Sequence, residues 1–176
     1  MLNQRGQEFS VFKLLISAIV AIVVLTLLLN ILGIVDFNPN TDPANAAENL
    51  LTSMDSSVYQ EKVTARLDFT SENSINTAAL AEATGLDREQ ICLLVEDDLS
   101  EFSSGTTANL INYTGSGTVR VKLAGICADQ TDFADADFFD SYAPKLATKT
   151  FEDIPSTCNF ATGQKACLLV LIKSDE

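Results

Sequence analysis

The sequence contains no histidine among its 176 residues. Histidine is the commonest general base and the commonest metal ligand in proteins, and it activates the nucleophile in Ser-His and Cys-His enzymes. Its absence removes all of these arrangements, and no other group of residues suggests a catalytic site. We therefore expect a protein that is not an enzyme, and we expect no cofactor.

Basic residues are also scarce, with 11 lysines and arginines against 24 aspartates and glutamates. Residues 36–176 carry nine of the basic and 23 of the acidic residues, a net charge of −14. Binding to nucleic-acid phosphates or to anionic lipid head groups requires a basic protein surface. We therefore expect this acidic region to bind neither.

One long run lacks charge altogether: residues 14–35, LLISAIVAIVVLTLLLNILGIV. A helix of these 22 residues would be about 33 Å long, enough to cross a hydrocarbon core of about 30 Å. Its clearly polar members, Ser17, Thr26 and Asn30, are too few to give the helix a polar face. The run predicts a transmembrane helix in contact with membrane lipid.

The charges that flank this run predict its orientation. Arg5 and Lys13 precede it, whereas Asp36 and Asp42 follow it. The positive-inside rule then places the N-terminus in the cytoplasm and the acidic region outside the cell. The chain is thus expected to consist of a cytoplasmic leader (1–13), a transmembrane helix (14–35), a proline-containing neck (36–43) and an extracytoplasmic domain (44–176).

The leader has three interpretations. A secretory signal peptide has a shorter hydrophobic core, of about 7–15 residues, with a cleavage site soon after it. The nearest A-x-A candidate after the hydrophobic run, at residues 44–46, lies well beyond its end. A plain signal anchor is the second interpretation, and it requires no processing.

The third interpretation comes from residues 5–10, RGQEFS, followed directly by the hydrophobic run. This segment resembles the class III signal peptide of archaeal type IV pilin-like proteins. The resemblance implies that a prepilin-type peptidase cuts between Gly6 and Gln7, and that the retained helices bundle into a filament core. That family commonly has Glu at the fifth mature position, where this chain has Val11, so Glu8 must take that role or the role is absent.

Within the hydrophobic run, Ser17 and Ala21 form a small-xxx-small pair, which allows two helices to approach closely. Self-association is therefore expected to involve Glu8, Ser17 and Ala21. The same pair is incidental in a simple anchor. Two hypotheses stay open: a pilin-like subunit that assembles through its N-terminal helix, and a single-pass membrane-anchored surface domain that binds a ligand or partner protein.

The extracytoplasmic region has the hydrophobic periodicities of an α+β domain. A helix capped by Asp42 and begun by Pro43 would place Leu50, Met54 and Val58 on one buried stripe. Alternation at residues 62–69 predicts one half-buried strand. We expect a mainly antiparallel sheet of about five strands packed by one or two helices. The expected strands are 62–69, 91–95, 110–113, 118–127 and 166–173, with a hairpin at the TGSG of 114–117 and a second helix at 75–83 ended by Gly85.

All four cysteines belong to this region, and none of them forms a C-x-x-C zinc knuckle. An even count outside the cell predicts two disulfides. Cys158 and Cys167 flank a glycine-containing turn, which favours their pairing and leaves Cys92 for Cys127. Cys92 and Cys167 begin similar CLLV segments and are the rival pair.

Two further patterns are weaker. Asp135, Asp137 and Asp140 could offer oxygen ligands to Ca²⁺, but the glycine and distal glutamate of an EF-hand loop are absent, so a solvated loop is the simpler interpretation. Asn112 begins an Asn-Tyr-Thr sequon next to the expected turn and is a candidate glycosylation site.

Overall fold

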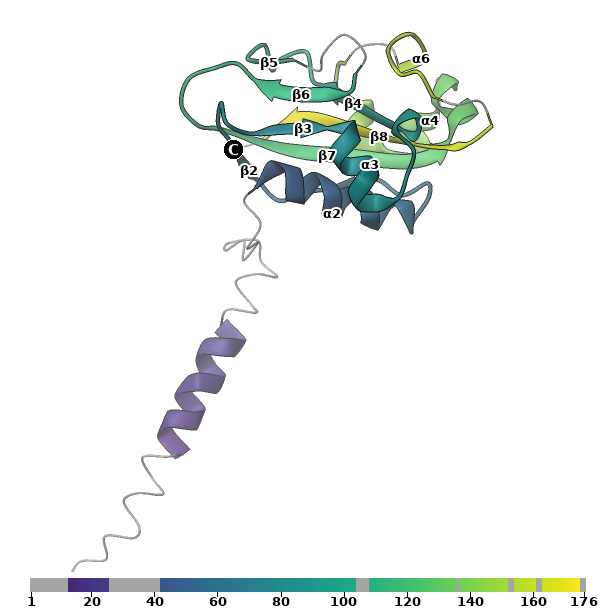
Figure 1. Ribbon diagram of the computed structural model, residues 1–176. Helices are drawn as coiled ribbons and strands as arrows, with labels where there is room; N and C mark the ends of the chain where they lie inside the picture. Colours follow the sequence, from purple (N-terminus) through teal and green to yellow (C-terminus); the bar gives the residue numbers. More distant parts are fainter. Residues whose placement is uncertain are drawn as a thin grey trace, which may run out of the picture. The chain divides into compact units, whose positions relative to one another are not determined.

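The computed structural model describes residues 13–25, 42–103, 108–135, 137–151, 154–160 and 163–174. The chain divides into two compact units, Met1–Pro39 and Asn40–Glu176. In the first unit, residues 13–25 form a helix whose residues are all exposed (Figure 1). The second unit, called the head domain below, has an α+β fold, as the sequence predicts.

Five strands of the head domain form one mixed sheet in the order β1-β7-β8-β4, with β2 also paired to β7. The long central strands β7 and β8 are antiparallel, whereas β4 runs parallel to β8. The sheet is therefore mainly antiparallel, as predicted, and its one parallel pair among the described strands lies at the β4 edge. The bounds are β1 Lys62–Val63, β2 Leu67–Phe69, β4 Ile91–Val95, β7 Val119–Asp129 and β8 Lys165–Lys173.

A second, antiparallel sheet has the order β3 (Ser74–Asn76), β6 (Leu110–Tyr113), β5 (Phe102–Ser103). The hairpin expected at residues 114–117 is wrong, because β6 and β7 belong to different sheets. The chain turns toward β5 instead. The backbone N–H and the hydroxyl of Thr114 both donate to the Glu101 carbonyl, at 2.8 and 2.9 Å.

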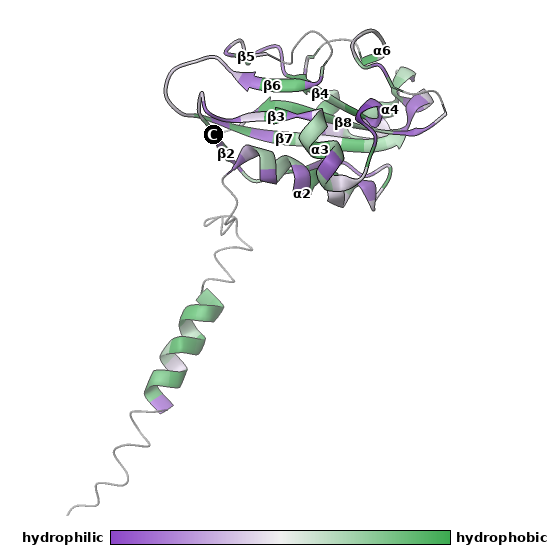
Figure 2. Cartoon of the chain, viewed as in Figure 1, coloured by the Kyte–Doolittle hydropathy of each residue, from purple (hydrophilic) through white to green (hydrophobic). Residues whose placement is uncertain are grey.

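The strand β8 is apolar almost throughout because both of its faces are buried. Cys167, Leu169 and Leu171 belong to a core shared with the small sheet and with two helices, α2 (Pro43–Asp55) and α3 (Thr77–Thr84). The intervening residues of β8 belong to a second core (Figure 2). That core includes residues of four short helices, η2 (Gln130–Ala134), α4 (Phe138–Tyr142), α5 (Pro144–Ala147) and α6 (Ile154–Thr157).

The ends of α2 and α3 follow the capping rules. The Asp42 carboxylate accepts a hydrogen bond from the Ala44 N–H, and Gly85 ends α3 in the left-handed conformation with φ 75°. However, α2 ends at Asp55, so Val58 is 40% exposed and does not join the buried stripe.

The expected strand at residues 62–69 is two short strands separated by a bulge. Val63 pairs with Ala124, and Leu67 pairs with Val121. The segment between Val63 and Leu67 therefore contains one residue more than the segment of β7 that it faces, which is a bulge. Thr64 occupies the bulge, where its hydroxyl accepts from the Leu123 N–H. One extra residue turns the side chains on its two sides to opposite faces of the sheet. Val63 accordingly packs in the second core, whereas Leu67 packs in the first.

Both disulfides form, but the pairing favoured by the sequence is wrong, and so is the rival Cys92–Cys167 pair. Cys127 bonds to Cys167 directly across the β7–β8 ladder, with a Cα–Cα distance of 4.0 Å. Cys92 bonds to Cys158 on the opposite face of the sheet. The turn argument fails because the residues before Cys158 form α6 rather than the partner strand of β8.

Glu96 is the one buried charged residue in the described part of the head domain. Its carboxylate accepts from the Lys173 backbone N–H at 2.7 Å and lies 3.2 Å from the Lys149 ammonium group. Lys149 follows α5, so this pair fastens the segment of short helices to the end of the sheet.

Breaking the Cys92–Cys158 bond should loosen the head domain. The bond closes a loop with a sequence separation of 66 residues. We expect the Cys92→Ala/Cys158→Ala double variant to lose about 2–4 kcal/mol of unfolding free energy. Urea denaturation in detergent, followed by circular dichroism, measures the loss. Non-reducing peptide mapping of the native chain provides the control, and a Cys158–Cys167 linked peptide there would contradict the assigned pairing.

Removal of the Glu96 carboxylate should also destabilise the head domain, because it leaves the half-buried Lys149 and the Lys173 N–H without their acceptor. We expect Glu96→Ala to cost about 1–3 kcal/mol of unfolding free energy. The neighbouring Asp97 is exposed, so Asp97→Ala should change that energy by less than about 0.5 kcal/mol. Equal urea midpoints for the two variants would refute a structural role for Glu96.

Candidate functional site

The proposed processing residues Gly6 and Gln7 and the proposed assembly residue Glu8 lie outside the described residues, as does residue range 26–41. Ser17 and Ala21 are both exposed on the helix of residues 13–25. The Ser17 hydroxyl donates to the Leu14 carbonyl at 2.9 Å, within its own helix. The pair is therefore placed where a second helix could approach it, and its role stays a prediction.

The helix of residues 13–25 is hydrophobic along most of its length (Figure 2). Its nine large aliphatic side chains are between 45% and 70% exposed. None of the described helices combines the length and the hydrophobicity required to span a bilayer.

The head domain contains a pocket of about 410 Å³, called the four-segment pocket below. Ligand sites commonly have volumes of about 300–1,000 Å³. The four segments are the start of α3, the η1 turn (Arg88–Gln90) with the start of β4, the start of β6, and the chain after α6. Its lining residues are Asn76, Thr77, Ala78, Arg88, Glu89, Ile91, Cys92, Asn109, Leu110, Cys158, Asn159 and Phe160.

Local hydrogen bonds fix two of these segments. Asn76 caps α3 by accepting from the Ala79 N–H at 2.7 Å, and the Thr77 N–H donates to the Asn109 carbonyl at 3.0 Å. In η1, the Gln90 side chain accepts from the Asp87 N–H at 2.8 Å, which completes a capping box. Arg88 and Glu89 lie within that box and are thereby held at the pocket.

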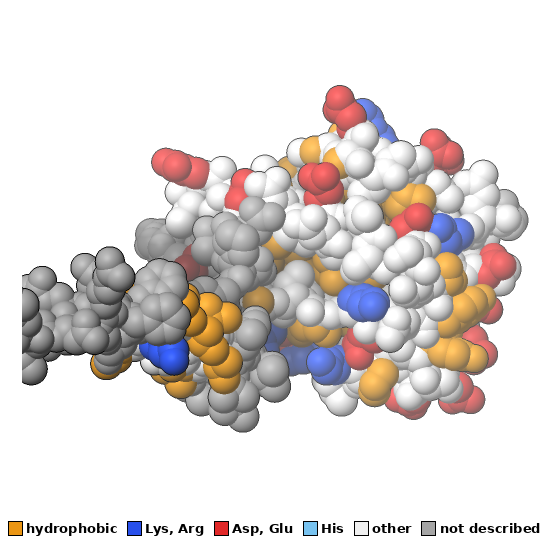
Figure 3. Space-filling view, turned by 90° about the horizontal axis from the view of Figure 1, so that it is seen from below, with side chains coloured by type: hydrophobic (Ala, Val, Ile, Leu, Met, Phe, Trp, Pro, Cys, Tyr) orange, Lys and Arg blue, Asp and Glu red, His pale blue; other side chains and the backbone are white. Residues whose placement is uncertain are grey.

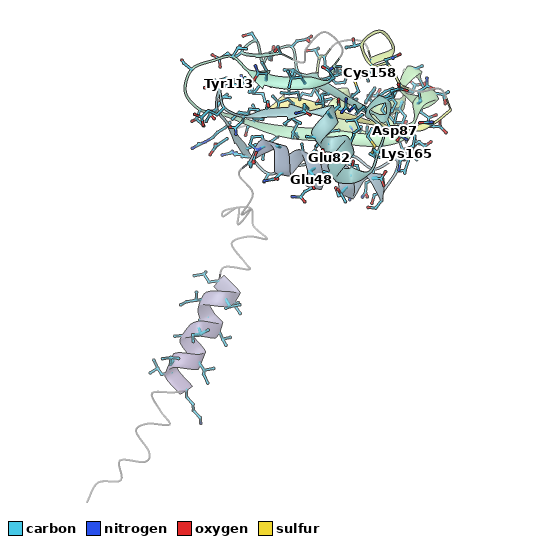
Figure 4. The ribbon with its side chains drawn as sticks, viewed as in Figure 1. Glu48, Glu82, Asp87, Tyr113, Cys158 and Lys165 are labelled. Atoms are coloured by element: carbon cyan, nitrogen blue, oxygen red, sulfur yellow. A yellow bond between two sulfur atoms is a disulfide. The ribbon has the colours of Figure 1, made fainter. Side chains whose placement is uncertain are left out.

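The Cys92–Cys158 disulfide forms part of the pocket wall and holds the fourth segment in place. Figure 4 shows Cys158 on the opposite side of the central strands from Glu48 of α2. Phe160 is half-buried, and its ring centroid lies 5.4 Å from that of Phe133 in the second core. The pocket therefore has a fixed wall made from distant parts of the sequence.

The pocket is lined by both polar and apolar residues. Arg88 supplies one cation, Glu89 one anion and three asparagines neutral donors and acceptors, while Ile91 and Leu110 are apolar. Elsewhere on the head domain acidic and basic side chains are interspersed, as Figure 3 shows for one face. An isolated arginine among amides is suited to hold one negative charge and several hydroxyl groups.

A second feature is an aromatic cluster in which the exposed residues Tyr59 and Tyr142 pack on the buried Phe138. The ring centroids of Tyr59 and Tyr142 are 5.4 Å apart, and both side chains are more than 40% exposed. Tyr59 has a left-handed backbone with φ 63°, which is uncommon for a residue with a side chain. Its hydroxyl donates to Asp132 at 2.7 Å. That hydrogen bond is the main cause that raises the pKa of the Tyr59 phenol above 10.

The acidic loop, a candidate Ca²⁺ site, and the sequon at Asn112 lie in the following surroundings. Asp135, Asp137 and Asp140 are exposed, and the Asp137 N–H donates to the Asp135 carboxylate at 3.1 Å. Across the described ranges no three histidine, cysteine or acidic side chains are placed to share a metal ion. Asn112 is half-buried in β6, between Ser74 and Ser103 of the neighbouring strands.

Sequence reasoning missed the pocket residues. The segment at 87–90 was readable as a capping box, because Asp at the N-cap with Gln three residues later is its signature. That signal locates a turn but not a ligand site. Nothing in the sequence indicated that Asn109 and Asn159 lie beside it, because their proximity depends on strand pairing and on the disulfide.

The Tyr59–Asp132 contact can be tested by alkaline titration. The neutral phenol donates to the carboxylate, so the contact favours the protonated form of Tyr59. We expect Asp132→Ala to lower the pKa of one tyrosine toward 10 in an absorbance titration at high pH. The matched variant Asp135→Ala should leave that pKa unchanged. An identical titration curve for Asp132→Ala and the native chain would show that the contact is absent in solution.

No protein-family model matches the chain, and no curated protein sequence or solved structure resembles it significantly. Its function must therefore be inferred from its own residues and geometry. The exposed apolar helix, the four-segment pocket and the aromatic cluster are the described features that bear on that inference.

Proposed function

We propose that this chain is a non-enzymatic, pilin-like subunit of a cell-surface filament or related membrane assembly. In this proposal the hydrophobic N-terminal segment 14–35 anchors the chain in membrane lipid and later packs against other copies of itself. The head domain is displayed outside the cell. The observation that carries the proposal is the exposed apolar surface of the helix at residues 13–25.

An exposed aliphatic surface of this kind requires an apolar environment. Burial of one leucine, isoleucine or valine side chain is worth about 1.5–3 kcal/mol. With nine such side chains exposed, water is a poor surrounding for this helix. Lipid and neighbouring helices both offer the burial that it lacks, and Ser17 and Ala21 would permit close helix packing.

The head domain supports an exterior location. Its two disulfides persist in oxidising compartments and are rare in the reducing cytosol. The net charge of residues 36–176, which is −14, favours solubility through self-repulsion and does not favour docking on anionic lipid. Arg5 and Lys13 before the hydrophobic run place the N-terminus in the cytoplasm.

Processing is the part of the proposal that depends on the resemblance. The sequence Arg5-Gly6-Gln7-Glu8 before the hydrophobic run supports cleavage by a prepilin-type peptidase after Gly6. Glu8 would then be the second mature residue and the acid available to register neighbouring subunits.

The alternative is a single-pass membrane-anchored surface domain that binds a ligand or a partner protein, with the helix as a tether. The four-segment pocket favours this candidate, because a filament subunit needs no pocket of about 410 Å³ in order to assemble. The two functions are compatible, since a filament subunit can also display a binding site.

Cleavage can be tested by intact-protein mass spectrometry of the full chain co-expressed with an archaeal prepilin-type peptidase. We expect a mature protein that begins at Gln7. Gly6→Leu should block cleavage, because the peptidase acts after a small residue, whereas Asn3→Ala should be processed normally. Retention of Met1 beside a peptidase that cleaves a known substrate would refute the pilin-like function.

Electron microscopy of cell-surface preparations then separates the two candidates. Filaments that are present with the native chain and absent with Gly6→Leu support assembly. Mature chains without filaments would leave the tethered surface domain as the function.

A further inference from the structure

We propose that the four-segment pocket binds a sugar that carries one carboxylate, of the uronic-acid class. The inference concerns only the head domain and does not depend on whether the chain forms filaments. It rests on the polar groups that the pocket leaves available, on their charges, and on the rigidity of its wall.

The first observation is the free hydrogen-bonding capacity at the start of α3, a helix of eight residues. Asn76 and Asn109 satisfy the N–H groups of Ala79 and Thr77, whereas that of Ala78 makes no hydrogen bond to any described residue. Helix N-termini favour negative charge at such N–H groups. Arg88 lines the same pocket and makes no ion pair within the described residues.

The second observation is Thr77, a residue that lines the pocket although it is only 5% exposed. Its hydroxyl makes none of the side-chain hydrogen bonds found in the described structure. No fully buried side-chain polar atom among the described residues lacks a partner, so this hydroxyl is still reached by solvent. The pocket provides the route by which solvent reaches this hydroxyl, and a ligand oxygen in the pocket would accept its hydrogen bond.

Together Arg88, the Ala78 N–H and the Thr77 hydroxyl supply three donors for one carboxylate. The remaining lining groups fit a polyhydroxylated ring. Asn109 and Asn159 can each donate to and accept from sugar hydroxyls, and Glu89 can only accept from them. The ring of Phe160, fixed against Phe133, offers an apolar face to the sugar C–H groups.

The charges of the residues that line the pocket limit the class of ligand that it can bind. Among the described residues that line the pocket, Arg88 is the only cation, and Glu89 is its neighbour in the chain. Glu89 and the net charge of the head domain repel a phosphate or a polyanion more strongly than they repel a single carboxylate. A simple carboxylic acid would leave Glu89 and the asparagines without partners. A single carboxylate on a hydroxyl-rich ring satisfies both the donors and the acceptors.

The probe for this proposal is D-glucuronate, titrated into the full chain in detergent micelles and followed by NMR shifts of labelled backbone amides. We expect shifts at residues 76–78 and 88–92, and much smaller shifts with D-glucose or acetate at equal concentration. Arg88→Gln should weaken D-glucuronate binding by about 10–100-fold, since it removes a charge-assisted contact. Asn159→Ala should weaken it by about 2–10-fold.

Arg120→Gln is the matched control, because Arg120 is an exposed arginine that pairs with Asp68 and does not line the pocket. It should bind D-glucuronate as the native chain does. Three outcomes would overturn the proposal: no shifts at the pocket residues, equal binding of D-glucose or acetate, or unchanged binding by both Arg88→Gln and Asn159→Ala. None of these variants changes the N-terminal cleavage site. A negative result here therefore would not contradict the proposed filament function.

Discussion

The pairing of β7 with β8 is the interaction on which the rest of the head domain depends. Nine residue pairs align these strands, from Val121 opposite Lys173 to Asp129 opposite Lys165. The Cys127–Cys167 bond locks this register near one end. At Gly125 an added Cβ would lie 2.6 Å from the Leu168 carbonyl oxygen and 2.8 Å from the Met54 sulfur, so only glycine lets α2 lie this close to the ladder.

Because β8 is buried on both faces, the head domain has two cores, and each core contains one disulfide. The segment of short helices at residues 130–160 covers the second core, and each of its described helices has only four or five residues. Cys92–Cys158, the Glu96–Lys149 ion pair and the Glu61 carboxylate fasten it. Glu61 accepts from the first N–H groups of α5 at 2.9 and 3.2 Å.

The contacts that hold the segment of short helices in place also hold part of the proposed binding site. The chain after α6 supplies Asn159 and Phe160 to the four-segment pocket, and the disulfide holds it against the start of β4. The other walls come from capped turns, whose geometry is fixed locally. In our proposal the N-terminal segment provides location and assembly, and the head domain provides recognition.

The sequence by itself determined features that depend on neighbouring residues. Strands Ile91–Val95 and Leu110–Tyr113 have the predicted bounds, and the cap at Gly85 ends α3 as expected. The apolar run that became β8 indicated a central strand correctly. Each of these follows from local propensity, capping or hydrophobic periodicity.

Tertiary structure alone decided what depends on register and on distant contacts. The bulge at Thr64 reversed the facing of Val63, although the alternation of residues 62–69 is regular in the sequence. The cysteine partners and the pocket were decided by which strands lie side by side and by where the chain after α6 returns. The hydrophobic periodicity of the sequence indicates which side chains become buried, but it does not indicate which part of the chain they pack against.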